Sequence, residues 1–129
     1  MSDLQKGEVV IVLGGAAHTL KPSLDAFSRL AARFETHAKL HEKLMAGDVS
    51  AMITVLRHGL KMSDSAAKAL PNMIFQCGVH ALIDPLVDYV FKLFNGGLSA
   101  EEWLSRQNSG DVAEAGGGGD AENPLLAGG

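Results

Sequence analysis

The sequence predicts an α+β fold, a mostly helical domain with an N-terminal β-hairpin and a disordered C-terminal tail. Residues 8–13 form a β-branched run that ends at a double glycine, which is typical of a strand and a tight turn. Between residues 22 and 106, apolar residues recur at spacings of three and four, the period of amphipathic helices. Residues 108–129 are Gly-rich and acidic, a composition typical of disorder. We therefore expect one compact domain over residues 1–107, followed by the tail.

The composition excludes several classes of function. All 11 Lys and Arg precede residue 107, whereas four of the 15 Asp and Glu follow it, so the net charge of −4 arises in the tail. No basic stripe is present, which argues against nucleic-acid binding. No run of about 18 apolar residues occurs, so we expect no membrane span. The N-terminus lacks the features of a secretory signal, and the single cysteine fits a reducing compartment.

The N-terminal hairpin leads directly into the first helix. We expect residues 8–13 and 16–21 to pair across the glycine turn, giving a hairpin over about residues 8–21. A lone hairpin is marginally stable in water, so it must pack on the helices. Pro22 suits the first turn of a helix, and the apolar spacing continues to Phe34. Six side chains are expected in the core: Leu24, Phe27, Leu30, Phe34, Leu56 and Phe91.

Three further helical segments are expected in the middle of the chain. A short helix over residues 36–45 precedes Asp48, which can cap the next helix. That helix runs to about residue 60. Ser63 starts another short helix, which Pro71 is expected to close.

The most hydrophobic segment, residues 72–94, contains Pro85. A proline inside a helix removes a backbone hydrogen bond. Two interpretations therefore stand: one kinked helix, or two helices with Asp84 as the N-cap of the second. The second is favoured because Asp followed by Pro is typical of a helix start. Asn95-Gly96-Gly97 is expected to end the segment.

A capping box formed by Ser99 and Glu102 predicts a final helix to Arg106. Trp103 lies on this helix, beside the expected tail. Two interpretations are open for it: the indole docks on the core, or it contacts a partner, since Trp is favoured in interface anchors.

No group of side chains forms a recognisable catalytic or metal site. His37 and His41 are one helical turn apart, but no third ligand is evident, so both are expected to face solvent. Cys77 and His80 are three residues apart, although a cysteine in an apolar run usually acts as a small hydrophobic residue. The glycines after the first strand match no phosphate-binding motif. We therefore predict no catalytic residue, no cofactor and no metal, and we expect the protein not to be an enzyme.

A set of short motifs occurs along the chain in a recognisable order: Gly7-Glu8-Val9, Leu13, Leu20-Lys21-Pro22-Ser23, Leu56-Arg57-His58-Gly59-Leu60 and Pro85. Through these residues, Gly7 to Trp103 resembles a known family, the phage tail assembly chaperones of gene transfer agents and related prophages, some of which are labelled tail tube proteins. The stretch Asn72–Ala81 is more apolar than the family pattern, and the tail is longer.

The resemblance implies a function without chemistry. Such a chaperone would bind the long helical tape measure protein, keep it soluble and promote polymerisation of the tail tube protein around it. It would act in the cytoplasm of the bacterial host. Two alternatives are a structural tail component, such as a tube or terminator subunit, and a small enzyme that uses Cys77 and His80.

Three side chains are candidate partner contacts: Val10, Val12 and Trp103. The two valines lie on the first strand, and an unpaired strand edge there would favour self-association. We expect the tape measure protein and the tail tube protein as partners, a homo-oligomer as a further outcome, and neither nucleic acid nor a membrane.

Overall fold

The computed structural model describes residues 6–109 and confirms the α+β class. The chain divides into two compact units, Met1–Leu98 and Ser99–Gly129. The elements are, in order, β1 (Val9–Leu13), β2 (Ala16–Leu20), α1 (Leu24–Phe34), α2 (His37–Met45), α3 (Val49–Gly59), α4 (Asp64–Ala67), α5 (Leu70–Cys77), α6 (Val79–Phe94) and α7 (Ala100–Ser109). Helix α7 lies in the second unit and extends three residues beyond the predicted Arg106. The tail predicted over 108–129 falls, from residue 110, outside the described residues.

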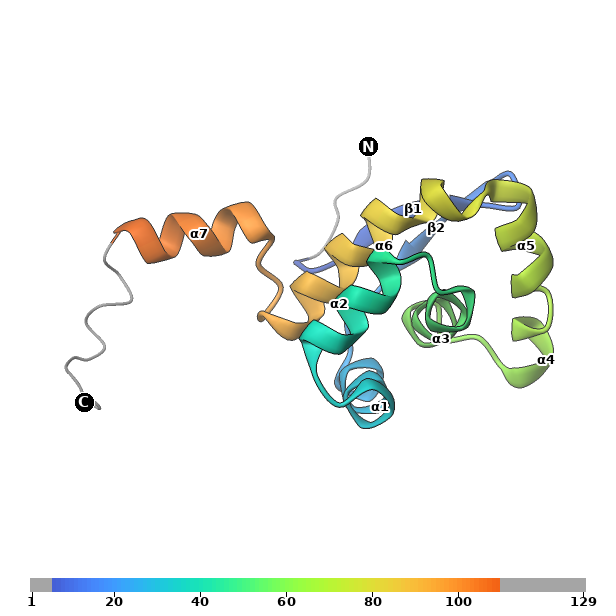
Figure 1. The fold of residues 1–129 in the computed structure, drawn as a ribbon, viewed down its shortest axis with the longest axis horizontal. Coiled ribbons are helices and arrows are strands. Elements are labelled where there is room, and N and C mark those ends of the chain that lie inside the picture. Colours follow the sequence, from blue (N-terminus) through green and yellow to red (C-terminus); the bar gives the residue numbers. More distant parts are fainter. Residues whose placement is uncertain (1–5, 110–129) are drawn as a thin grey trace. The chain divides into compact units, whose positions relative to one another are not determined.

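The hairpin has the predicted glycine turn. β1 and β2 are antiparallel, with Val9 opposite Leu20 and Leu13 opposite Ala16, so the turn consists of Gly14 and Gly15 (Figure 1). Both glycines have positive φ, which residues with a Cβ rarely adopt. Side chains alternate along β1, where Val9, Ile11 and Leu13 are buried. The hairpin thus buries one face against the helices.

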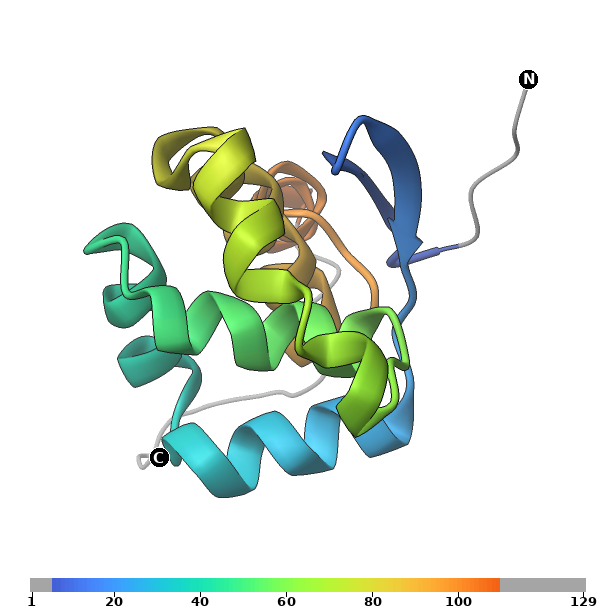
Figure 2. The same ribbon diagram turned by 90° about the vertical axis from the view of Figure 1, so that its right-hand side faces the viewer.

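Helix α3 is the central helix of the first unit. It packs on α1, α2, α5 and α6. Figure 1 looks along α3, with α1 below it and α6 above it, and Figure 2 shows the hairpin standing along one side of the helices. The core is formed by the inner face of the hairpin and by side chains of these five helices, among them Leu30, Leu40, Met52, Ile74 and Leu86.

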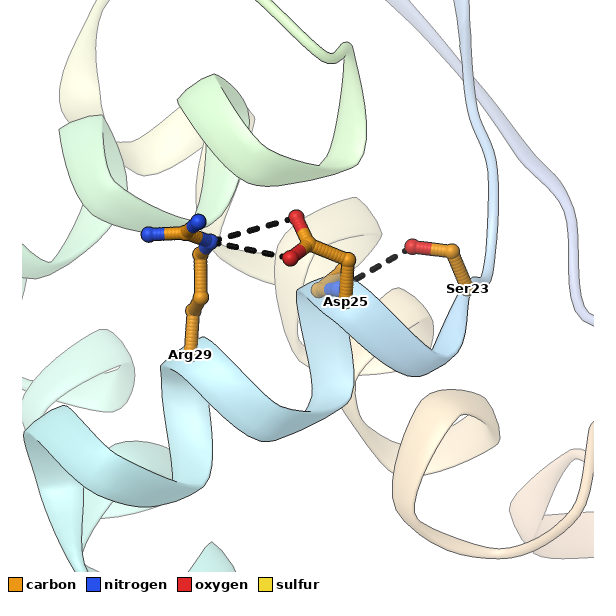
Figure 3. Close-up of polar contacts among 4 residues, drawn as sticks. Ser23, Asp25 and Arg29 are labelled. Atoms are coloured by element: carbon orange, nitrogen blue, oxygen red, sulfur yellow. Dashed lines mark hydrogen bonds and ion pairs between the residues drawn. The ribbon is translucent and has the colours of Figure 1, made fainter.

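Side-chain caps set the start of four helices in the first unit, as polar residues just before an apolar period predict. Ser23 caps α1, so Pro22 precedes this helix and does not lie in its first turn as predicted. The Ser23 hydroxyl accepts a hydrogen bond from the Ala26 amide at 3.0 Å (Figure 3). Thr36, Asp48 and Ser63 cap α2, α3 and α4 in the same way. Each cap satisfies one of the amides that a helix leaves unpaired at its N-terminus.

Three of the six predicted core residues are buried: Leu30, Phe34 and Leu56. The prediction is wrong for Leu24 and Phe27, which are 78 % and 37 % exposed, and Phe91 is only partly buried. The apolar stripe of α1 is longer than its contact with the other helices. Its first turn therefore extends past the core and leaves apolar surface uncovered.

The predicted break at Pro85 is also wrong. Helix α6 runs through Pro85, so Asp84 does not cap a helix. The break lies at Gly78, whose φ of 95° ends α5 and starts α6, and the two helical segments that meet there are bent by 119°. Pro71 lies in the first turn of α5 instead of closing the helix before it. A glycine with positive φ therefore makes the turn, and the two prolines are accommodated within helices.

The hairpin is fixed to the helices where β2 ends. The Lys21 amide donates to the Gly59 carbonyl at 3.0 Å, and the Tyr89 hydroxyl donates to the Lys21 carbonyl at 2.7 Å. A Cβ on Gly59 would lie 2.7 Å from Leu20 Cδ2 and 3.3 Å from the Tyr89 ring. Gly59 is thus the point of closest approach between α3, β2 and α6.

No single helix within residues 6–109 is long and apolar enough to cross a membrane. The bent pair Asp64–Cys77 and Val79–Phe94 meets the criterion only when its two segments are counted together, and then by length and composition alone.

Candidate functional site: an apolar groove beside the start of helix α1

A groove of about 480 Å³ lies between the start of α1 and the end of α6. Its floor and walls are largely apolar. The lining residues are Lys6, Pro22, Ser23, Leu24, Phe27, Lys92, Leu93, Phe94, Gly96 and Gly97. It lies within the first unit and contains two exposed large apolar residues of that unit, Leu24 and Phe27. Uncovered apolar surface of this kind commonly marks a binding groove.

The groove forms where α1 starts and α6 ends. Leu24 and Phe27 are three residues apart on α1, so they form a ridge one helical turn long. The Phe27 ring meets the Phe94 ring at a centroid distance of 5.0 Å and an interplanar angle of 57°. Helix α6 stops just beyond Phe94, where Gly97 donates its amide to the Lys92 carbonyl at 2.7 Å. The predicted stop at Asn95-Gly96-Gly97 is confirmed, and it opens the end of the groove.

His37 extends the aromatic cluster beneath the groove. Its ring stacks on Phe94 at 5.3 Å and meets Phe91 edge-on at 5.7 Å. Burial, followed by the charge of His41, lowers the pKa of His37 below its ordinary value. Its Nε2 is buried without a hydrogen-bond partner. The expectation that His37 faces solvent is therefore wrong, because α2 turns the ring towards α6, whereas His41 is exposed as predicted.

Two lysines border the groove. The aliphatic part of Lys6 lies across Gly97, since a Cβ added there would meet Lys6 Cγ at 2.7 Å. Lys92 Nζ lies 3.2 Å from an Asp88 carboxylate oxygen one turn earlier on α6. Among the residues that the structure describes, no carboxylate belongs to the lining. The border is therefore positively charged.

A second hollow of about 400 Å³ lies on another face of α1, lined by Asp25, Arg29, Arg57, His58, Lys61 and Met62. Arg29 Nε donates to both Asp25 oxygens, at 3.0 and 3.2 Å (Figure 3), and Arg57 pairs with Asp64. Burial, followed by Arg29 and Arg57, lowers the pKa of His58. Arg57 and His58 lie in the last turn of α3, where cations are favoured by the helix dipole. Structural roles therefore account for this cluster.

The predicted contacts Val10 and Val12 lie on the outer face of β1, 45 % and 60 % exposed. In a hairpin with a two-residue turn, these residues direct their N–H and C=O groups away from β2. The Cys77 thiol donates to the Val12 carbonyl at 3.7 Å, so α5 covers part of this edge. Fewer backbone groups of this edge are therefore free to pair with a partner strand than the sequence predicts.

Neither Cys77 nor His80 belongs to the lining of the groove. Cys77 ends α5 and is partly buried, while His80 follows the Gly78 turn and is exposed. Within the part of the chain that the structure describes, no three His, Cys, Asp or Glu side chains are grouped to hold a metal ion. Trp103 lies on α7 and is 37 % exposed. Whether it docks or contacts a partner stays a prediction.

Comparison with protein-family models, with curated proteins and with solved structures gives no match.

Sequence reasoning missed the groove because it placed Leu24 and Phe27 in the core. One signal could have pointed to it. Leu24 directly follows the Ser23 cap, and the first turn of a helix that starts at the surface often extends past its neighbours. The positions of Lys6 and Lys92 depend on tertiary packing and have no local signal.

Proposed function

We propose that this chain is a non-catalytic tail assembly chaperone that binds a tape measure protein and promotes assembly of the tail tube around it. The observation that carries the proposal is the apolar groove, with Leu24 and Phe27 uncovered on a small helical unit. The resemblance of Gly7 to Trp103 to that family supplies the identity of the partner.

The groove suits a helical partner. A ridge of side chains on one helix packs between the side chains of another, and amphipathic helices dock in apolar grooves through residues at i, i+3, i+4 and i+7. A tape measure protein would offer many such segments. Many weak contacts along one coil give strong overall binding with ready release at each site.

The outer face of β1 is the proposed contact for a tail tube subunit. Val10 and Val12 project from it, and the strand ends at an exposed turn. A partner strand added at this edge would have to displace the Cys77 thiol from the Val12 carbonyl. Contacts through side chains alone need no such displacement.

Co-expression with a tape measure protein tests the proposal. We expect the native chain to keep the tape measure protein in the soluble fraction and to co-purify with it. If the tape measure protein precipitates equally with and without the chain, the proposal fails. If the chain instead stays in finished particles in fixed stoichiometry, the alternative of a structural tail component replaces it.

A further inference from the structure

We infer that the groove selects an amphipathic helix whose apolar stripe is flanked by acidic residues, and that Lys6 and Lys92 make the selection. As a statement about the natural partner, the inference rests on the proposed function. As a statement about the chemistry of the groove, it stands on the lining residues alone.

The border of the groove carries more positive than negative charge. Lys6 and Lys92 contribute two ammonium groups, and no carboxylate is among the described residues that line the groove. Asp88 partly balances Lys92, but its own side chain is 44 % exposed and thus screened by water. The start of α1, with its partial positive charge, belongs to the same wall. An incoming helix therefore meets a positive border around an apolar floor.

The two lysines place their charges at the edge of the groove. Lys6 lies across Gly97, and the Lys92 side chain is only 21 % exposed, so both aliphatic stems pack along the groove. Such lysines cover apolar surface with their stems and keep the ammonium at the edge. Their charges are therefore placed beside the apolar stripe of a bound helix, where its flanking residues lie.

The same charges disfavour a second copy of the chain as the occupant. A symmetric dimer through this face would set groove against groove, bringing Lys6 and Lys92 of both copies together. Like charges at an interface oppose binding. A partner with acidic flanks gains from the same arrangement.

Two helical peptides test the inference on the full chain. Both are about 15 residues long, the length at which an isolated helix becomes marginally stable. Both carry the same leucine stripe, flanked by Glu in one peptide and by Lys in the other. Fluorescence anisotropy measures binding. We expect the Glu peptide to bind at least about tenfold more tightly at low salt, with the difference shrinking as salt screens the charges.

Paired variants locate the effect. We expect Lys6→Gln with Lys92→Gln to bring the two affinities within about threefold, because the border charge is removed. The matched control, Lys39→Gln with Lys68→Gln, removes two lysines outside the groove and should keep the preference. We expect Leu24→Ser to weaken both peptides about tenfold through lost apolar contact, whereas Phe75→Ser, at an equally exposed site on α5, leaves them unchanged. Equal urea midpoints confirm that the variants are folded.

Three outcomes overturn the inference: equal affinity for both peptides, an acidic preference that survives loss of both lysines, or a dimer in sedimentation that Leu24→Ser dissociates. The two proposals fail separately. If the Leu24→Ser variant keeps the tape measure protein soluble as well as the native chain does, the groove is not the binding site, and the chaperone proposal still stands. If the native chain binds the Glu peptide selectively but does not keep the tape measure protein soluble, the inference about the groove stands and the chaperone proposal fails.

Discussion

The helical backbone conformation of Gly59 would suit any residue, but neighbouring atoms fill the space that a side chain needs. Alanine normally stabilises a helix by about 1 kcal/mol over glycine. Here the added Cβ would lie 2.7 Å from Leu20 Cδ2. We expect Gly59→Ala to lower the free energy of unfolding by about 1–3 kcal/mol, measured by urea titration, because the contact forces β2 and α6 to shift.

A double variant identifies the cause. Leu20→Val removes the atom that the new Cβ meets, so Gly59→Ala should cost less in that background. Ser28→Ala, at an exposed position of α1, serves as the control and should change stability little. An equal cost of Gly59→Ala in both backgrounds would show that the clash with Leu20 is not the reason.

Tyr89 offers a direct optical test of the same junction. Its side chain is fully buried, and burial raises the pKa of its hydroxyl from 10.0 to about 12. Because the folded state favours the protonated phenol, this stabilising contribution is complete below pH 10 and is lost as the pH rises towards 12. Tyr89 is the single tyrosine of the chain. We therefore expect the phenolate absorbance to appear near pH 12 in the folded protein and near pH 10 in urea.

The hydrogen bond from Tyr89 to the Lys21 carbonyl gives the companion measurement. Tyr89→Phe leaves that carbonyl without this partner, so we expect a loss of about 1–2 kcal/mol in the free energy of unfolding. A phenolate that appears near pH 10 in the folded protein would contradict the described burial.

At the scale of the elements, the break between two helices lies at Gly78 and not at Pro85, where the sequence predicts it. Gly78 has open space at its Cβ position but a φ of 95°. We expect Gly78→Ala to destabilise the protein by about 1–2 kcal/mol through backbone strain alone. Pro85→Ala restores an amide that can donate to Ala81, and we expect it to raise stability by about 1 kcal/mol or more. Urea midpoints measure both.

The comparison between these two variants decides which residue makes the turn. If helix α6 instead began at Pro85, that substitution would be neutral or harmful, since proline favours the first turn of a helix. Loss of stability in Pro85→Ala combined with a neutral Gly78→Ala would restore the predicted break at Asp84.

Local signals explain which elements the sequence predicts well. The hairpin turn, the cap at Asp48, the helix start at Ser63 and the stop at Asn95 each act through residues close in sequence. Pro85 was misread because tertiary packing keeps α6 helical at the cost of one hydrogen bond. Leu24 and Phe27 were misread because a helical period shows which residues share a face, and not how far the neighbouring helices extend along it.

The same reasoning explains why the candidate site was not predicted. The sequence indicated Val10 and Val12, whose alternation on a strand is visible locally. The groove needs Lys6, Leu24 and Lys92 to meet, and they come from three separate parts of the chain. Three of the residues that carry the resemblance, Leu20, Lys21 and Gly59, lie at the hairpin junction. They therefore support the fold, and the partner has to be inferred from the groove.

At the scale of the whole molecule, the described core belongs to the first unit. Every buried apolar residue lies between Val9 and Val90, and the side chains of α7 described up to residue 107 are exposed. The capping box of α7 is internal to the second unit, with Ser99 and Glu102 each donating an amide to the other's side chain, at 2.9 and 3.1 Å. Helix α7 therefore has its own start signal and contributes no described side chain to the core.

The division into two units leads to a prediction for a shortened chain that ends at Leu98. Removing residues 99–129 deletes none of the described buried side chains, so we expect the free energy of unfolding to stay within about 0.5 kcal/mol of that of the full chain. Urea titration followed by far-ultraviolet circular dichroism measures it for both chains.

Trp103, the single tryptophan, supplies an independent reading in the full chain. An exposed indole should show nearly the same emission maximum before and after unfolding. A stability loss above about 1 kcal/mol, together with a blue-shifted native emission, would instead show that Trp103 docks on the core as large buried aromatics do.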